Sequence, residues 1–227
     1  MSYVIPSWEL TSLPVVDSED RFPVRRIYCI GRNYAEHARE MGMDERDPPF
    51  FFMKPTDAIV QNGAKIPYPP QTKNYHYEGE LVVAIGGSAS NISVADANNC
   101  IYGYGVGLDM TRRDVQIAAR EMGRPWDMGK GFDNSAPCSE ILPVTKIGHP
   151  TQGRIHLEVN GETKQDADIK DMIWNVPESI SYLSGLVTLE AGDLIMTGTP
   201  AGVGPVISGD TMVVSVEGVT ELTCTIA

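Results

Sequence analysis

Residues 78–85 read EGELVVAI, in which two acidic side chains precede five apolar ones. A continuous apolar run of this length, rich in Val and Ile, is typical of a strand that is buried on at least one face. Side chains two positions apart on a strand point to the same side, so Glu78 and Glu80 are expected to converge on one spot. The stretch therefore predicts a core strand that begins at a pair of carboxylates.

Similar runs elsewhere predict that this strand belongs to a mainly β domain. The clearest local prediction is a hairpin at 154–164, because Asn160-Gly161 separates two runs that alternate apolar and polar side chains. The other expected strands are 24–30, a short one ending at Lys54, 101–108, 194–197, 212–216 and 221–226.

Helices are fewer in the pattern. They are expected at 34–43 and 176–186, and a third should start near Thr111, which forms a capping-box pattern with Asp114. Strands do not alternate with helices, and the glycine-rich run at 103–107 does not continue as GxGxxG into a helix. The sequence therefore predicts an α+β, mainly β, fold and argues against a dinucleotide-binding one.

Length and composition favour one globular unit. The chain has 227 residues, 42% of them hydrophobic and 21% charged, which suits a single domain of enzyme size. Proline-punctuated residues 1–24 are expected to form an N-terminal extension, and residues 25–227 one domain. The net charge of −12 argues against a nucleic-acid partner, because phosphate backbones bind basic grooves.

The expected location is the cytoplasm. No apolar run approaches the roughly 20 residues that a membrane helix needs. The first residues, MSYVIPSWELTS, lack the basic start and apolar stretch of a secretory signal. The four cysteines share no CxxC spacing, so they are expected to be reduced and mostly buried.

A third acidic residue, Asp109, follows the expected strand 101–108. If the two strands are neighbours, Asp109 joins Glu78 and Glu80, and like charges in one place are costly unless a cation lies between them. Carboxylate oxygens alone suit Mg²⁺ or Mn²⁺ better than zinc. The alternative, which the spacing alone favours, is that both glutamates lie on the solvated face of an edge strand.

Six blocks, in a fixed order, carry a family resemblance. They are GRNYAEH (31–37), KP (54–55), YEGE (77–80), GLDMT (107–111), KGFD (130–133) and TGTPAGVG (197–204). On these blocks the chain resembles the fumarylacetoacetate hydrolase family over residues 25–227. Its short length resembles the compact acylpyruvate hydrolase branch.

The resemblance implies a mixed β-roll fold, a homodimer and one Mg²⁺ or Mn²⁺ per subunit. It also implies three kinds of site residue. The metal ligands are Glu78, Glu80 and Asp109, and the substrate-binding residues are Arg113, Gln116 and Thr199. The catalytic residues are Lys130 and the pair His37 and Glu40, of which only the pair lies on a lid helix.

The residue types are compatible with these roles and with plainer ones. His37 and Glu40 share a helix face, so the carboxylate could orient the imidazole as a general base, or the two could be an incidental polar pair. Lys130 lies between glycines and could stabilise an oxyanion or be a solvated loop lysine. Arg113 and Gln116 could hold a substrate carboxylate or lie on an exposed helix face.

Three further sequence features predict mainly structural roles. The run 197–204 predicts by itself only a turn, and with the resemblance the Thr199 hydroxyl or nearby backbone amides would hold the substrate carboxylate. Phe50 to Phe52 are expected in the core rather than around the substrate. The remaining histidines, His76, His149 and His156, are expected to be structural, with a supporting role near the metal open for the first of them.

Together these expectations describe hydrolysis of a 3-acylpyruvate, a 2,4-dioxo acid, with fumarylpyruvate as the first choice. Water activated by His37 and Glu40 would attack the distal carbonyl, Lys130 would stabilise the oxyanion, and pyruvate would leave as its enolate. Oxaloacetate decarboxylation and dioxo-acid isomerisation on the same metal site are alternatives. A catalytically silent 2-oxo-acid-binding module is the non-enzyme alternative.

The tail of the acyl group is not specified by any motif. A fumaryl tail needs a second cationic contact, and the candidates are Arg32, Arg39 and Arg124.

Overall fold

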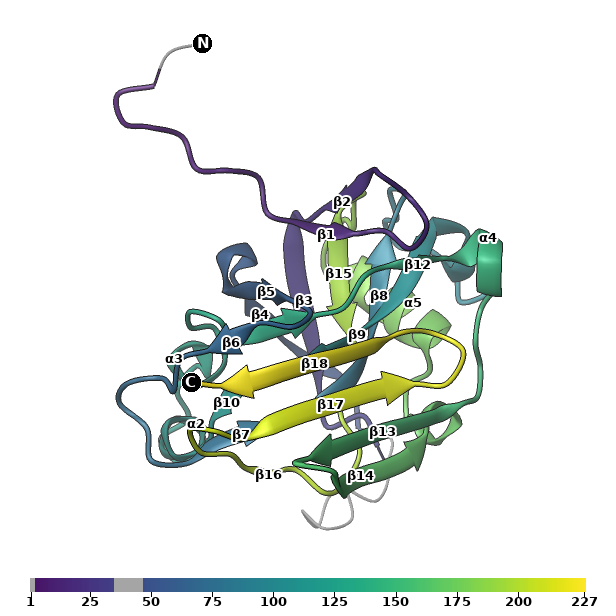
Figure 1. Cartoon of the computed structure of the whole chain (residues 1–227). Helices are drawn as coiled ribbons and strands as arrows, with labels where there is room; N and C mark the ends of the chain where they lie inside the picture. Colours follow the sequence, from purple (N-terminus) through teal and green to yellow (C-terminus); the bar gives the residue numbers. More distant parts are fainter. Residues whose placement is uncertain (1–2, 35–46) are drawn as a thin grey trace.

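A computed structural model describes residues 3–34 and 47–227 of the chain, and its centre is an eight-stranded mixed sheet (Figure 1). The predicted helix at 34–43, with His37 and Glu40, lies outside the described residues apart from Tyr34. The sheet has the order β4 (Phe50–Lys54), β3 (Arg26–Gly31), β15 (Asp193–Met196), β8 (Gly79–Ile85), β9 (Ile101–Leu108), β11 (Ala136–Cys138) and β5 (Ile59–Gln61), with β12 (Leu142–Pro143) paired to β9.

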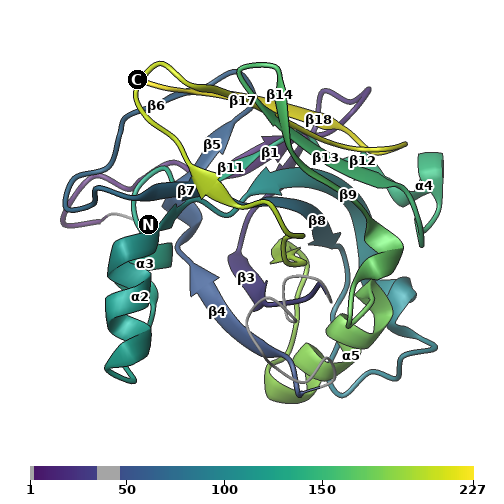
Figure 2. The ribbon, with the colours of Figure 1, turned by 90° about the horizontal axis from the view of Figure 1, so that it is seen from below.

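A second, five-stranded sheet crosses this one, and Figure 2 shows how the first sheet curls beneath it. Its strands are β14 (Glu162–Asp168), β13 (Arg154–Val159), β17 (Thr211–Val216), β18 (Glu221–Ile226) and β6 (Lys65–Ile66). Smaller ribbons join β10 (Thr111–Arg112), β7 (Tyr75–Tyr77) and β16 (Gly204–Pro205), and pair β1 (Ser12–Pro14) with β2 (Arg21–Pro23).

Helices are few, as predicted. The α-helices of the described residues are α2 (Arg113–Glu121), α3 (Asp127–Lys130), α4 (Val144–Ile147) and α5 (Val176–Leu186). Short 3-10 turns occupy Thr56–Ala58, Ala97–Cys100 and Ile169–Asp171. No helix of the described chain is both long enough and apolar enough to cross a bilayer.

Strand β8 is buried on both of its faces. Leu81, Val83 and Ile85 point into the larger core, which β13, β17, β18 and α5 close. Val82 and Ala84 point into a second core beneath the β1–β2 ribbon. Because neither face meets water, every side chain after Glu80 is apolar, and this explains the unbroken run in the sequence.

The predicted hairpin is confirmed in register and turn. Strands β13 and β14 pair antiparallel, and Asn160 and Gly161 have φ of 53° and 78°, as a type I′ turn requires. The capping box predicted at Thr111 is wrong. Residues 111–112 pair with β7, the helix begins at Arg113 without a side-chain cap, and the Thr111 hydroxyl bonds to the carbonyl of Asp109.

The N-terminal segment divides into two parts. Leu13, Phe22 and Val24 are buried in the second core. Residues 3–10 instead run away from the body of the molecule as an arm (Figure 1), and five large apolar side chains on it, Tyr3, Val4, Ile5, Trp8 and Leu10, are mostly exposed.

Candidate active site

The end of β9 lies beside the start of β8, and this places three carboxylates together. The strands are antiparallel with Gly79 opposite Leu108, and the Asp109 amide donates to the Glu78 carbonyl at 2.9 Å. Glu78, Glu80 and Asp109 are all buried, and one carboxylate oxygen of each lies within 4.8 Å of one from each of the others. The solvated-edge alternative for the two glutamates is therefore wrong.

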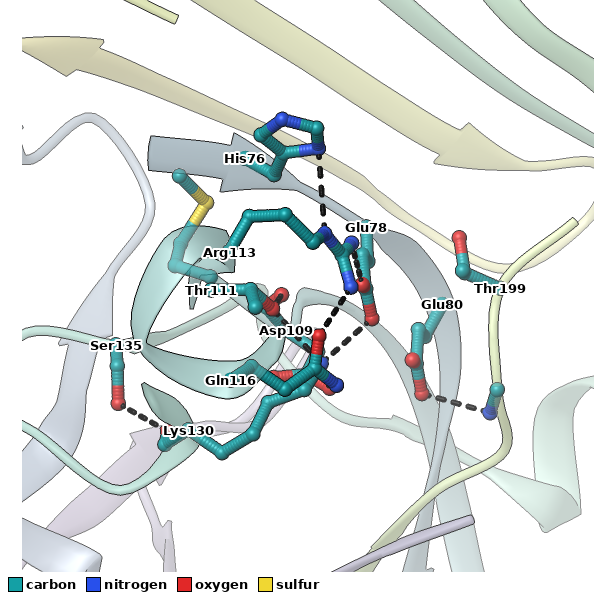
Figure 3. A network of polar contacts seen from close by, with 12 residues as sticks. His76, Glu78, Glu80, Asp109, Thr111, Arg113, Gln116, Lys130, Ser135 and Thr199 are labelled. Atoms are coloured by element: carbon teal, nitrogen blue, oxygen red, sulfur yellow. Dashed lines mark hydrogen bonds and ion pairs between the residues drawn. The ribbon is translucent and has the colours of Figure 1, made fainter. Parts of the chain in front are cut away.

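Lys130, the last residue of α3, is buried and reaches into this cluster (Figure 3). Its Nζ donates to Glu78 Oε2 at 2.8 Å, to Asp109 Oδ2 at 2.6 Å and to Thr111 Oγ1 at 2.7 Å. Burial by itself would lower the pKa of Lys130, but the two carboxylates raise it above its ordinary value. The structure thus gives a charged ammonium among the carboxylates rather than a solvated loop lysine.

Arg113, the first residue of α2, approaches the same glutamate from another side. Its Nη2 donates to Glu78 Oε1, and its Nη1 donates to Gln116 Oε1 at 2.6 Å, so the predicted contact across one turn of the helix is present. Burial alone would raise the pKa of Glu78, but Lys130 and Arg113 outweigh burial and lower it to about 2. Glu78 is therefore ionised in the protein.

Glu80 has a different environment. Its Oε2 accepts a hydrogen bond of 2.7 Å from the amide of Gly198, in the glycine-rich turn after β15. Burial, followed by the charges of Asp109 and Glu78, raises its pKa well above the ordinary value. Of two glutamates two residues apart, one is held as an anion and the other favours the protonated form unless a cation joins it.

A second buried lysine, Lys54 at the end of β4, was not among the predicted site residues. Its Nζ lies 2.8 Å from Asp109 Oδ1 and donates to the carbonyl of Met110 at 3.2 Å and to that of Lys130. It thus fixes both the third carboxylate and the loop that carries the catalytic lysine candidate. The sequence feature that could have identified Lys54 as a site residue is its position at the end of an apolar run, directly before a proline.

His76, expected to be structural with a supporting role near the metal left open, lies next to the site. Its Nδ1 accepts a contact of 3.4 Å from Arg113 Nε, and its Nε2 lies 2.8 Å from Asn74 Oδ1. Burial and then the charge of Arg113 lower its pKa to about 4. The imidazole of His76 is therefore neutral, and it contacts the Nε side of the Arg113 guanidinium.

Thr199 lies beside the carboxylates, but its hydroxyl is already occupied. Thr199 Oγ1 donates to the carbonyl of Gly79 at 2.8 Å and accepts from Gln165 Nε2 at 2.8 Å. A hydroxyl has one proton to donate. Of the two predicted ways for this segment to hold a carboxylate, the geometry therefore favours backbone amides.

The cluster opens into a cavity of about 740 Å³. Seven of the nine predicted site residues line it, and His37 and Glu40 lie outside the described residues. Phe52 packs against the second core, as expected, but it also lines the cavity, and its ring centroid lies 5.0 Å from Lys130 Nζ.

The donor set fits a hard divalent cation. Carboxylate oxygens are the ligands that Mg²⁺ and Mn²⁺ prefer, and three of them are grouped here at the wall of a cavity. Glu78 and Asp109 have cationic partners, whereas its own burial and the nearby charges of Asp109 and Glu78 raise the pKa of Glu80, so a bound cation would favour the charged form of Glu80. Glu78, Glu80 and Asp109 are thus suited to bind such an ion.

Comparison with known proteins assigns this fold and site to a class. The sequence profile of the fumarylacetoacetate (FAA) hydrolase C-terminal family matches residues 26–227. The chain belongs to the fumarylacetoacetate hydrolase family, and the expected mainly β fold of that family is confirmed.

Individual proteins of this family show which of its enzymes the chain is similar to. The fumarylpyruvate hydrolase of a Ralstonia species is 50% identical over 177 residues, 78% of this chain and 92% of the relative. The crystal structure of fumarylpyruvate hydrolase from Pseudomonas aeruginosa in complex with Mn²⁺ and pyruvate is also 50% identical, with a TM-score of 0.97 over 100% of this chain and 99% of that one. A mitochondrial oxaloacetate tautomerase of Arabidopsis thaliana is 42% identical over 197 residues, 87% of this chain and 88% of the relative.

Proposed function

We propose that this chain is a divalent-metal-dependent hydrolase that cleaves a carbon–carbon bond of a 3-acylpyruvate. The preferred substrate is fumarylpyruvate, which with one water gives fumarate and pyruvate. The observation that carries the proposal is the buried group of Glu78, Glu80 and Asp109 beside Lys130 in a large cavity. The two fumarylpyruvate hydrolases at 50% identity, one solved with Mn²⁺ and pyruvate, support the choice of substrate and ion.

The three carboxylates would hold Mg²⁺ or Mn²⁺, which supplies a Lewis acid for the 2-keto oxygen of the substrate. Arg113 and the amide group of Gln116 face the cavity and would orient the substrate carboxylate. Backbone amides near Thr199 would bind the same group. These contacts would leave the acyl carbonyl, rather than the keto group, for the attacking water.

Lys130 would stabilise the negative charge that develops on the acyl oxygen. Its ammonium is buried, and a fixed positive charge in a dry site acts more strongly than one in water. The raised pKa keeps it charged at neutral pH.

His37 and Glu40 would remove a proton from the attacking water. The bond between C3 and C4 then breaks, C4 leaves as the carboxylate of fumarate, and C3 accepts a proton to give pyruvate. A His37→Ala variant is expected to lose hydrolysis, because no base then activates the water. Unchanged hydrolysis in that variant would contradict this assignment.

The deciding experiment assays the full chain, loaded with Mn²⁺, against fumarylpyruvate, acetylpyruvate and oxaloacetate in parallel. We expect pyruvate release from fumarylpyruvate with the highest kcat/KM, and its loss after dialysis against EDTA. Binding of oxalate with no turnover of any dioxo acid would favour the silent binding module and overturn the proposal.

Oxaloacetate chemistry is the second candidate, because an oxaloacetate tautomerase is 42% identical. Tautomerisation needs proton transfer but no attacking water, and decarboxylation needs an electron sink but no water. Either activity should persist in His37→Ala to a greater extent than hydrolysis does. Faster turnover of oxaloacetate than of any acylpyruvate would make this the principal function.

Three broader expectations are also proposals. Residues 25–227 form the catalytic domain and residues 1–24 an extension of it. The enzyme acts in the cytoplasm, which is consistent with four free, buried cysteines. Two copies associate as a homodimer, and the exposed apolar side chains of residues 3–10 support this, because such a patch is stable when a partner covers it.

A further inference from the structure

Four basic side chains line the cavity, and they form two groups. Arg113 and Lys130 lie at the inner end and contact Glu78. Arg120, near the end of α2, and Arg32, just after β3, line the cavity as well. Among the described residues, Glu78 and Asp109 form their ion pairs with Arg113, Lys130 and Lys54. Arg120 and Arg32 are therefore not among the cations that neutralise these two candidate metal ligands.

One face of α2 connects the two groups. Arg113, Gln116, Ile117 and Arg120 all line the cavity, and they are spaced i, i+3, i+4 and i+7, so they lie along one stripe of the helix. Seven residues of α-helix rise about 10 Å. The stripe thus places the backbone of Arg120 about 10 Å along the helix axis from that of Arg113, whose guanidinium contacts Glu78.

This separation matches the length of a particular class of substrate. Fumarylpyruvate has carboxylates at both ends of a seven-carbon chain, and six bonds in extended form span about 8 Å, since three backbone bonds span about 3.8 Å. With one carboxylate beside Arg113, the other reaches the region of Arg120. Acetylpyruvate and oxaloacetate are too short to do so.

Arg32 is held in place by unusual local structure. It adopts a φ of 55°, which is uncommon for a residue other than glycine, and its guanidinium lies 5.0 Å from the ring centroid of Phe50. Burial and then the charge of Arg120 lower its pKa, while Asp47 raises it. Both guanidinium-bearing residues line the cavity, and two cationic side chains on one cavity wall are a favourable place for an anion.

We propose that Arg32 and Arg120 bind the distal carboxylate of a dicarboxylic substrate, so that the cavity selects 3-acylpyruvates whose acyl group carries its own carboxylate. The proposal rests on the proposed function for the chemistry at the other end of the substrate. Of the three arginines considered from the sequence, Arg32 lines the cavity, Arg124 is not among the lining residues, and Arg39 lies outside the described residues. No sequence motif singles out Arg120.

The test uses Arg120→Gln and Arg32→Asn, because Asn tolerates the positive φ. Arg124→Gln is the matched control, an exposed arginine near the same helix end that does not line the cavity. Each Mn²⁺-loaded variant is assayed with fumarylpyruvate and with acetylpyruvate. Loss of a charged hydrogen bond should lower kcat/KM for fumarylpyruvate about tenfold to a hundredfold, and leave acetylpyruvate within about twofold. Equal losses for both substrates, or the same loss in Arg124→Gln, would overturn the proposal.

A binding measurement separates this inference from the proposed function. Calorimetry compares fumarate with crotonate, which has the same four-carbon trans skeleton and one carboxylate. The wild-type protein should prefer fumarate, and Arg120→Gln should remove the preference. If no dioxo acid releases pyruvate but this preference is present and lost in the variant, the proposed function fails and the anion subsite stands. If pyruvate is released and Arg120→Gln changes neither binding nor selectivity, the subsite fails alone.

Discussion

Lys54 Nζ lies 2.8 Å from Asp109 Oδ1, and both side chains are almost completely buried. With Lys130 and Arg113 there are thus three cations around three carboxylates. These cations hold Glu78 and Asp109 in place while Glu80, the least neutralised of the three, favours its proton. The ion pairs therefore pre-form the site, and Glu80 is the carboxylate whose ionised form a bound cation would stabilise most.

Replacing Lys54 with Met should lower the free energy of unfolding by about 3 kcal/mol or more, because it leaves part of a buried carboxylate without its partner. Lys146→Met is the control. Its ion pair with Asp17 is shorter, 2.6 Å against 2.8 Å, but exposed, so we expect a change below about 1 kcal/mol. Urea denaturation in EDTA measures both. Similar small changes in the two variants would show that the buried pair contributes no more than a surface one.

The two glutamates should respond in opposite ways to an isosteric amide. Glu80→Gln mimics the protonated form that Glu80 favours, so the metal-free protein should be as stable as the wild type or more so. Glu78→Gln removes the anion that Lys130 and Arg113 surround, and should destabilise it. Both variants should lose the rise in Tm that Mn²⁺ gives the wild type. Equal destabilisation by the two substitutions would contradict the different pKa directions.

The same shifts predict how the stability of the metal-free protein depends on pH. The pKa of Glu78 is lowered from 4.5 to about 2, so its contribution is complete above about pH 4.5 and is lost as the pH falls toward 2. The pKa of Glu80 is raised, so its contribution is complete below its unfolded value and decreases as the pH rises. Urea titrations at a series of pH values give the free energy of unfolding as a function of pH. Glu78→Gln should make this free energy depend less on pH below about pH 4.5, and Glu80→Gln should do so above pH 4.5. An unchanged profile in both variants would contradict this assignment.

Gly198→Ala should weaken metal binding as well as stability. Gly198 has a φ of 93°, its amide donates to Glu80, and an added Cβ would lie 2.7 Å from Cβ of Asn33. Gly209→Ala is the matched control, with a φ of 97° and no atom within 4 Å of the added Cβ. The positive φ should lower the free energy of unfolding by about 1 kcal/mol in both variants, and the contact with Asn33 should cost about 1–3 kcal/mol more in Gly198→Ala. The affinity for Mn²⁺ should fall in Gly198→Ala alone. Equal Mn²⁺ affinity in the two variants would show that this amide does not fix Glu80.

The N-terminal arm should control association. A double substitution of Ile5 and Trp8 by Ser removes two exposed apolar side chains from the arm and should shift light-scattering mass toward the monomer. Ile207→Ser is the control, because Ile207 is similarly exposed but lies in the loop between β16 and β17 instead of on the arm. A monomeric wild type, or a dimer that both variants leave intact, would exclude the arm as the contact.

The sequence by itself determined the elements whose local signals are strong. An apolar run between turns predicted β8, Asn-Gly between alternating runs predicted the β13–β14 hairpin, and the apolar pattern of residues 176–186 predicted α5. It also placed Glu78 and Glu80 on one side of a strand, since that depends only on spacing. The start of α2 was missed because pairing with β7 outweighs the local capping pattern at Thr111.

Only the tertiary structure decided what surrounds the carboxylates. Whether Asp109 joins Glu78 depends on β8 and β9 being neighbours, and Lys54 reaches Asp109 across 55 positions of chain because β4 ends beside the loop after β9. The pKa values of Glu78 and Glu80 move apart because different partners, contributed by distant segments, meet two residues of the same type. Charge and burial at a site are properties of spatial neighbours, and no local pattern specifies them.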